Sequence, residues 1–186
     1  MNIPPQKNDP MVNWEAQMKA IVDVTTVEDF WQVYNYIEPV SNLNEGQDYS
    51  LFKKGIFPDW SDFQNMQGGR LIIDMKREEQ DGRMSRGERL ETMWIELLLI
   101  LIGEQAKKNA NQINGVIINV KKKADRLAVW LRNASDREGV VGVGRLVKNS
   151  LYLGDKVMYF KEHDQGQQGK NVRRNASNNS PAKMYI

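Results

Sequence analysis

The sequence predicts an α+β fold, with one curved, mostly antiparallel sheet that carries helices on its outer face. Two observations lead to this class. Strand patterns alternate with three amphipathic helix patterns along the 186 residues. Several strand patterns are joined by connections too short for the crossover helices that parallel strands require. The length suits one domain with a sizeable hydrophobic core.

The N-terminal part of the chain predicts a flexible segment and then a helix. Residues 1–13 are polar and contain prolines, which favours an irregular N-terminal segment. Thr26 followed by Asp29 is a capping-box pattern that starts a helix. The apolar residues after it repeat at helical spacing, namely Phe30, Trp31, Val33, Tyr34 and Ile37. Pro39 ends this helix.

Two strand patterns frame an irregular stretch. Residues 49–52 and 70–75 predict strands, because each is a short run rich in apolar residues. Residues 55–63 contain glycine and proline and fit neither regular structure. The glycine pair at 68–69 predicts a turn before the second strand. Residues 76–89 are mostly charged and polar, and they predict a solvated hairpin or loop.

The stretch 89–104 predicts the helix around which the rest of the chain packs. Ser85 followed by Glu88 predicts where this helix starts, and Gly103 predicts where it ends. Its inner stripe repeats at helical spacing and consists of Leu90, Met93, Trp94, Leu97, Leu98, Leu101 and Ile102.

A second apolar strip on the same helix allows two interpretations. Ile95 and Leu99 lie one turn apart on a different face, beside Glu96. Periodicity alone favours a helix that is buried nearly all round. The alternative is a helix whose second strip is left for a partner protein. The helix is too short and too closely flanked by charges to span a membrane.

The second half of the chain predicts a hairpin, a third helix and a last full strand. Residues 115–120 and 126–131 predict two strands, and residues 121–125 predict a tight basic turn between them. Asp136 caps a helix whose apolar positions are Val140, Val141, Val143, Leu146 and Val147. Residues 155–160 predict the last strand.

These elements define the expected domain limits. Residues 14–162 form the expected domain. Residues 163–186 are poor in apolar side chains and rich in Gln, Asn, Gly and Arg, which predicts a mobile C-terminal loop and tail, with room for one short last strand.

Composition excludes several function classes. The formal net charge is +2, so a nucleic-acid role must rest on a local basic patch. The chain has no cysteine, and its single histidine is His163, which excludes thiolate chemistry and multi-histidine metal sites. No paired carboxylates or nucleophile–base pair stand out. We therefore expect no catalysis, no cofactor and no metal. The first residues lack the apolar run of a signal peptide, which favours a cytoplasmic setting, with the nucleus as a second compartment.

Aromatic and basic residues are the positive signal. Trp14 and Trp60 lie in predicted loops, and Lys121, Lys122, Lys123 and Arg126 gather at one predicted turn. Tryptophans in loops can stack on a flat ring, and lysines and arginines neutralise phosphates. Taken alone the pattern is weak, because loop tryptophans often cover a core and lysine-rich turns are usually only solvated.

Seven short sequence segments carry a resemblance to a known family, which gives these aromatic and basic residues a specific interpretation. They are Thr26–Trp31, Asp48–Lys53, Pro58–Trp60, Gly68–Arg70, Leu101–Glu104, Gly115–Val120 and Leu127–Trp130. Their order and spacing over roughly residues 7–162 resemble the eukaryotic translation initiation factor 4E family. The resemblance implies a cupped antiparallel sheet backed by three helices, with the 7-methylguanosine cap of messenger RNA bound in its concave mouth.

The resemblance also implies roles for single residues. In the family, two indoles stack on the methylated base, at the positions of Trp14 and Trp60. The cap-binding positions that the resemblance implies are Trp14, Glu15, Trp60, Ser61, Asp62, Lys121, Lys123 and Arg126. A scaffold or repressor protein would place a Tyr-x-x-x-x-Leu-hydrophobic helix on the other side. The implied partner-binding residues there are Val27, Trp31, Ile95, Glu96 and Leu99.

Three departures from the family pattern matter. Ser61 follows Trp60 where the family carries a glutamate that accepts hydrogen bonds from the guanine, and Asp62 is the neighbouring acid. Leu71 replaces a tryptophan that is structural in the family, which predicts a change in the core. The family's first strand has no counterpart here, so the resemblance is to an N-terminally shortened or divergent member.

Different classes of function stay open. The leading one is a cap-binding factor that promotes or represses translation initiation. The alternative is a protein–protein interaction module, or a translational repressor, with weak or lost cap binding. A general RNA-binding domain is less favoured, because the sequence contains no broad basic face.

Overall fold

The computed structural model describes residues 18–76, 84–163 and 184–185. The chain divides into two units, residues 1–37 and 38–186. The elements in chain order are α1 (Val27–Tyr36), η2 (Val40–Asn42), β1 (Asp48–Phe52), β2 (Gly69–Lys76), α2 (Arg86–Ile102), η3 (Lys107–Gln112), β3 (Ile113–Asn119), β4 (Ala124–Leu131), α3 (Arg137–Ser150), β5 (Met158–Glu162) and β6 (Met184–Tyr185).

The first unit contains α1, whose start follows the predicted capping box. The Thr26 hydroxyl oxygen accepts a hydrogen bond from the Asp29 backbone N–H at 3.1 Å. The Asp29 carboxylate accepts one in return from the Thr26 backbone N–H at 3.0 Å. Ile37 is already extended, two residues before Pro39. The predicted start of the helix is therefore confirmed, whereas its end is at Tyr36, before the predicted Ile37.

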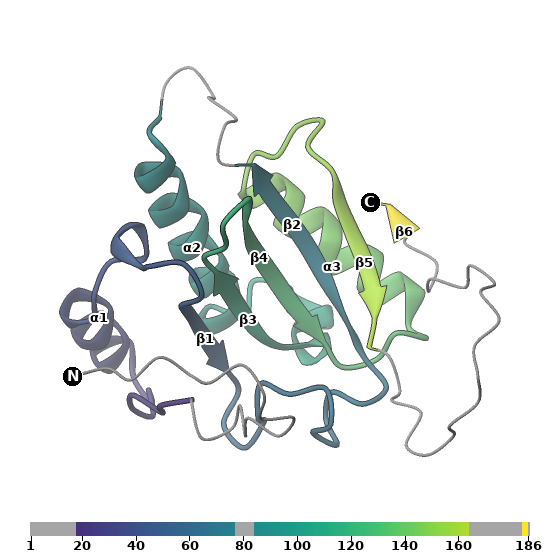
Figure 1. The fold of residues 1–186 in the computed structure, drawn as a ribbon. Helices are drawn as coiled ribbons and strands as arrows, with labels where there is room; N and C mark the ends of the chain where they lie inside the picture. The colour runs from purple at the N-terminus through teal and green to yellow at the C-terminus, as the bar shows by residue number, and fades with distance from the viewer. Residues whose placement is uncertain (1–17, 77–83, 164–183, 186) are drawn as a thin grey trace, which may run out of the picture. The chain divides into compact units, whose positions relative to one another are not determined.

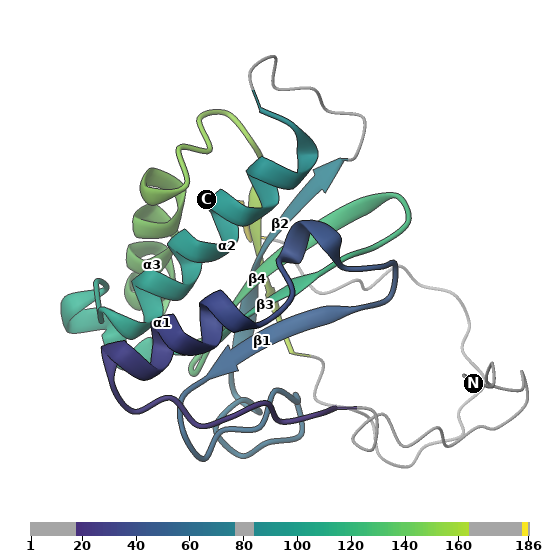
Figure 2. The same ribbon diagram turned by 90° about the vertical axis from the view of Figure 1, so that its left-hand side faces the viewer.

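The second unit is built on one antiparallel sheet. Its strand order is β1-β3-β4-β2-β5-β6, and each neighbouring pair runs antiparallel. Helices α2 and α3 both lie against the same face of this sheet (Figures 1 and 2). Within the described part of this unit, no helix covers the other face, which we call the open face. The predicted α+β class is confirmed.

Alternation along the strands explains how the two faces differ. In β2, Leu71 and Ile73 are buried on the side of the helices, while Asp74 is exposed on the open face. The inner stripe of α2 is buried, as its spacing predicts, and consists of Leu90, Met93, Trp94, Leu97, Leu98 and Leu101. Leu71 is 0% exposed. Leu71 therefore lies inside the core, as predicted.

Several predicted boundaries differ from the structure. Strand β3 is Ile113–Asn119 rather than 115–120, and β4 begins at Ala124 rather than 126. Helix α2 begins at Arg86, inside the stretch 76–89 that was predicted as a hairpin or loop. The last full strand is 158–162 rather than 155–160, because Gly154 has a φ of +56° and the Lys156 N–H closes a turn onto the Leu153 carbonyl at 2.9 Å. Gly69 begins β2 rather than forming a turn. Lys76 belongs to the same strand.

The start of the third helix agrees with its prediction, whereas the predictions for the two chain ends are not tested. The third helix does start at Asp136, whose carboxylate accepts from the Gly139 N–H at 2.9 Å. The predicted flexible segment, residues 1–13, and most of the predicted tail, residues 163–186, lie outside the described residues.

Candidate functional site

Three cross-strand rows of side chains cover most of the open face. Register places the following residues opposite one another from β1 across to β2 or β5. The first row, which we call the polar row, is Asp48, Asn119, Arg126 and Asp74. The second is Ser50, Ile117, Ala128, Ile72 and Tyr159. The third is Phe52, Gly115, Trp130, Arg70 and Lys161.

An apolar strip runs across the middle of this face. It consists of Phe52, Ile117, Ala128, Trp130, Ile72 and Tyr159. The ring of Phe52 meets Trp130 edge to face, with 5.5 Å between the ring centroids. Gly115 makes this possible, because a Cβ there would collide with the Phe52 ring. The Arg70 guanidinium lies 5.3 Å from the Trp130 ring centroid, so the strip also carries a cation over an indole.

The loop before β2 presents Trp60 at one end of the sheet. We call residues 57–66 the Trp60 loop. The Trp60 side chain is 52% exposed, which is unusual for an indole. Asp59, by contrast, is buried and accepts a hydrogen bond from the Ser61 backbone N–H at 2.7 Å. The loop is therefore braced from inside while its tryptophan faces solvent.

Asp62 is one of these braces. One carboxylate oxygen accepts from the Phe57 N–H at 2.8 Å, and the other accepts from the Gln64 N–H at 2.7 Å. Both oxygens are thus engaged within the loop. The cap-binding role that the resemblance implies for Asp62 stays a prediction, and an oxygen that accepted from a ligand would compete with the backbone amide that it already holds.

Two buried asparagines fasten the Trp60 loop to the sheet. Asn65 donates through its side-chain amide to the Phe57 and Asp59 carbonyls, each at 2.8 Å. Asn114, in β3, donates to Asn65 Oδ1 at 2.9 Å and to the Gln64 carbonyl at 2.7 Å. The sheet therefore fixes the position of the backbone beneath Trp60.

The opposite end of the sheet carries the predicted basic turn, Lys121–Lys123. All three lysines are exposed. The turn is anchored by Asp125, whose carboxylate is almost fully buried and takes two hydrogen bonds from Arg86 at 2.7 and 2.9 Å. The same carboxylate accepts from the Lys121 N–H at 3.3 Å. The first residue of α2 therefore holds the turn in place.

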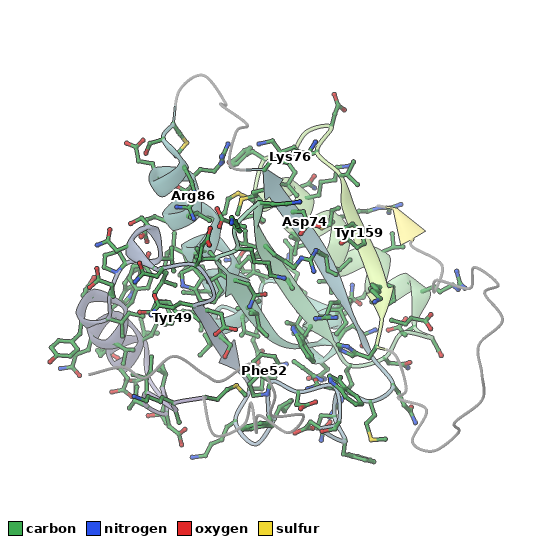
Figure 3. The ribbon with its side chains drawn as sticks, viewed as in Figure 1. Tyr49, Phe52, Asp74, Lys76, Arg86 and Tyr159 are labelled. Carbon is green, nitrogen blue, oxygen red and sulfur yellow. The ribbon has the colours of Figure 1, made fainter. Side chains whose placement is uncertain are left out.

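Arg126 lies beside this turn on the open face, in an ion pair with Asp74. Arg126 Nε donates to Asp74 Oδ1 at 2.6 Å, and a terminal nitrogen donates to Oδ2 at 3.0 Å. The Tyr159 hydroxyl donates to Asp74 Oδ2 at 3.1 Å. Figure 3 shows Asp74 and Tyr159 close together above β2 and β5.

The electrostatics of these groups follow from their neighbours. Burial alone would raise the pKa of Asp74, but the hydrogen bonds and charge of Arg126, with the Tyr159 hydroxyl, hold that pKa below its ordinary value. The hydrogen bonds to Asp74 raise the pKa of Arg126. Burial and the nearby Arg126 charge lower the pKa of Lys121, so its cationic form is less favoured than that of a free lysine.

The implied partner-binding residues belong to both units of the chain. In the first unit, the Val27 and Trp31 side chains are 63% and 40% exposed. In the second unit, Ile95, Glu96 and Leu99 of α2 are each partly exposed, so this helix is not buried all round. The second strip is accessible, and its role stays a prediction. Trp14 and Glu15 lie outside the described residues.

Sequence reasoning missed two residues of the open face. Asp74 was not recognised as the partner of Arg126, and Tyr159 was not placed near either. A usable signal existed, because Arg70, Asp74 and Lys76 are charged residues at even spacing in an otherwise apolar strand. The pairing itself needs the register between strands, which the sequence does not provide.

Two negative findings complete the site. Over residues 18–76 and 84–163, no three His, Asp or Glu side chains cluster as metal ligands would. Within the same described part, no helix has the length and apolar character needed to cross a membrane.

Comparison with known proteins relates the chain to one family. The family model described as eukaryotic initiation factor 4E matches residues 2–178. Human eukaryotic translation initiation factor 4E is 40% identical over 152 residues, which cover 82% of this chain and 67% of the human protein. The same factor of Aplysia californica is 37% identical over 170 residues, covering 90% of this chain and 76% of that protein.

Solved structures give the same relation. Ascaris suum eIF4E-3 with an m2,2,7G cap superposes with a TM-score of 0.77 at 34% identity, covering 88% of each chain. Caenorhabditis elegans eIF4E-3 with the 4E-binding protein Mextli superposes with a TM-score of 0.76 at 35% identity, covering 84% of this chain and 87% of that one.

Proposed function

The chain belongs to the eukaryotic initiation factor 4E family, and from this premise we propose that it binds the 7-methylguanosine cap of messenger RNA on its open face. It thereby takes part in translation initiation or its regulation. The proposal includes no catalytic step. We place this activity in the cytoplasm, with the nucleus as a second compartment.

One observation carries the proposal: an exposed indole and a set of cations lie at opposite ends of the same strands. Trp60 lies on the loop tied to the start of β3, and the basic turn follows the end of β3. On β4, Trp130 and Arg126 share the open face four residues apart, or about 13 Å along the strand. A nucleotide with an extended phosphate chain matches such a spacing, with its base at the Trp60 end.

In this proposal each end has its own task. Trp60 and Trp14 stack on the base, whose methylation at N7 makes it cationic and strengthens its attraction to electron-rich ring faces. Lys121, Lys123 and Arg126 meet the phosphates. Glu15 lies next to Trp14 and supplies a negative charge to the same neighbourhood.

The guanine edge is the weak part of the site. Ser61 offers a hydroxyl but no charge, and both Asp62 oxygens are engaged within the loop. A charge-assisted acceptor contributes about 1.5–3 kcal/mol. We therefore expect cap binding with reduced affinity and reduced rejection of unmethylated guanosine.

The proposal extends to a protein partner. Val27, Trp31, Ile95, Glu96 and Leu99 are exposed or partly exposed, which a docking role requires. The partner is a scaffold or repressor protein with a Tyr-x-x-x-x-Leu-hydrophobic helix. Such a helix lays its apolar side chains into a groove, as amphipathic recognition helices do.

The engagement of Asp62 also supports a second candidate. If the loss of a guanine-binding carboxylate removes useful cap affinity, the protein acts as an interaction module or repressor through its partner-binding residues alone. The two candidates differ in a single measurable quantity, the affinity for a methylated cap relative to an unmethylated one.

A fluorescence titration decides between them. Saturating 7-methylguanosine triphosphate is expected to quench tryptophan emission, and guanosine triphosphate is expected to bind more weakly. Trp60→Ala is expected to weaken binding about tenfold or more, because base–aromatic stacking contributes about 1–3 kcal/mol. Trp31→Ala is the matched control, since it removes another exposed indole that is not among the implied cap-binding residues. Absence of quenching in the unmodified protein would leave the interaction module as the function.

A further inference from the structure

We propose that Asp74 is an internal competitor for phosphate, which occupies Arg126 until a polyphosphate displaces it. The inference rests on the proposed function in one respect only, which is that the polyphosphate in the cell is the triphosphate of the cap. The competition itself concerns any polyphosphate that reaches the open face.

The geometry of the ion pair is the first argument. Asp74 takes two parallel hydrogen bonds from Arg126, at 2.6 and 3.0 Å. This fork-to-fork arrangement is the one by which a guanidinium binds a phosphate group. A phosphate cannot use the same two N–H groups while the carboxylate holds them. Binding through this edge of Arg126 therefore requires Asp74 to give way.

The accessibility of the pair is the second argument. The side chains of Arg126 and Asp74 are 29% and 35% exposed. Arg86 is nearly as exposed as Arg126, at 28%, but its partner Asp125 is only 2% exposed, so the two ion pairs differ in the accessibility of the acid. The Arg86 pair anchors a turn from within, whereas the Arg126 pair lies open to a ligand from solvent.

The third argument is that Asp74 is held in position by a second group. The Tyr159 hydroxyl donates to Asp74 Oδ2, while its ring packs against the apolar strip that includes Ile72. Tyr159 thus limits the freedom of the carboxylate and favours the conformation that pairs with Arg126. Asp74 competes as a preorganised group, which is more effective than an unrestrained side chain.

The polar row contains two acids, Asp74 and Asp48, and of these two described residues only Asp74 accepts hydrogen bonds from Arg126. The charges of Arg126 and Arg70 both act on Lys121 and on the Tyr159 hydroxyl, and the charge of Asp74 acts on the same two groups. Asp48 belongs to the same row, but its carboxylate accepts from the Asn119 amide at 2.9 Å and takes no bond from Arg126 in the described structure. Asp48 therefore lowers the local potential without blocking the Arg126 donors.

The test uses inorganic tripolyphosphate as the probe, with the Arg126 Nε–H resonance followed by NMR. Asp74→Asn is expected to tighten tripolyphosphate binding about three- to tenfold, since it removes both the competitor and a repelling charge. Asp48→Asn is the matched control, because it removes one charge from the same row and leaves the ion pair intact. It is expected to change the affinity by less than about twofold.

Tyr159→Phe provides an independent variant. It keeps every charge and removes only the hydrogen bond that holds Asp74, so a smaller tightening of the same sign is expected. Unchanged or weaker tripolyphosphate binding in both Asp74→Asn and Tyr159→Phe overturns the inference, and so does an equal gain in Asp48→Asn. If Asp74→Asn does not fold, the Tyr159→Phe result decides.

A parallel titration separates this inference from the proposed function. The second probe is the nucleoside 7-methylguanosine, which carries no phosphate. Asp74→Asn is expected to leave the affinity for this nucleoside unchanged and to tighten the binding of 7-methylguanosine triphosphate. If the unmodified protein fails to bind either methylated ligand, the proposed cap binding fails. The tripolyphosphate result still stands or falls by itself, because it involves no base.

Discussion

Asn114 in β3 donates its side-chain amide to Asn65 Oδ1 at 2.9 Å, across 49 positions of the chain. Both residues are buried, at 1% and 0% exposure. Asn65 in turn holds the carbonyls of Phe57 and Asp59. The loop that presents Trp60 is thus positioned by a polar network beneath it rather than by the packing of the tryptophan.

The first prediction concerns this network. Asn114→Ala leaves buried acceptors on Asn65 and Gln64 without donors, and it should destabilise the protein by about 2 kcal/mol. Cap affinity should also fall, because Trp60 loses its fixed support. Thermal denaturation and a cap titration check both effects. Asn119→Ala is the control, because Asn119 lies on β3 like Asn114 but makes only an exposed hydrogen bond to Asp48 of β1. This control should leave the free energy of unfolding within about 0.5 kcal/mol.

Ser61 gives the second prediction. Ser61→Glu should tighten 7-methylguanosine triphosphate binding about ten- to a hundredfold and sharpen rejection of guanosine triphosphate, because it adds a charged acceptor at the guanine edge. Asp62→Asn should lower the stability of the protein, because the carboxylate accepts hydrogen bonds from two backbone amides of its own loop. It should not change the ratio of the affinities for methylated and unmethylated ligand. A silent Ser61→Glu together with loss of cap selectivity in Asp62→Asn would contradict this assignment.

The partner surface gives the third prediction. Trp31→Ala should weaken binding of a helical Tyr-x-x-x-x-Leu-hydrophobic peptide by about 2 kcal/mol or more, because large exposed indoles are typical anchors of interfaces. Leu99→Ala should act in the same direction. Calorimetry with the peptide measures both losses, and cap affinity should stay nearly unchanged. Tyr152→Ala is the control, since Tyr152 is 92% exposed and belongs neither to the implied cap-binding residues nor to the implied partner-binding residues. Peptide binding that is indifferent to Trp31 would remove this surface from the proposal.

Acidity gives the fourth prediction. The pKa of Asp74 is lowered in the folded protein, so its ion pair contributes stability above the unfolded pKa, near 3.8, and loses it as the pH falls through the folded pKa. The pair is partly exposed, and about 0.5–1 kcal/mol is expected at pH 7. Asp74→Asn should therefore be slightly less stable at pH 7, with the difference fading as the pH falls through the lowered folded pKa of Asp74. A difference that persists in acid, measured by urea denaturation, would mean that the asparagine disturbs packing instead.

Much of the fold could be predicted because local patterns and tertiary structure agree. The capping boxes at Thr26 and Ser85 start helices, and the inner stripe of α2 is buried as its spacing requires. The boundary of β5 was missed because it depends on a turn at Gly154 that precedes pairing with β2. The boundaries of a strand depend on the neighbouring strand with which it pairs, and a single sequence does not show which strand that is.

Part of the candidate site could likewise be predicted from the sequence, and part could not. Trp60 and the basic turn could be singled out from residue type, and a resemblance to a known family supplied their meaning. The pairing of Asp74 with Arg126 could not be predicted, because it joins residues 52 positions apart through strand register. The involvement of Asp62 within its own loop was likewise hidden, since the same residue type would serve a ligand equally well.

The short β3–β4 connection has a consequence for the order in which the molecule assembles. A hairpin closed by the Lys121–Lys123 turn has contacts that are close in sequence, and such contacts form in microseconds. The Asn65–Asn114 contact closes a loop of 49 residues and costs more chain entropy. The cationic end of the site should therefore be protected early in refolding, and the Trp60 end should open first under mild denaturant. Native-state hydrogen exchange would reveal this as lower protection at Gln64 and Asn65 than at Leu127 and Ala128.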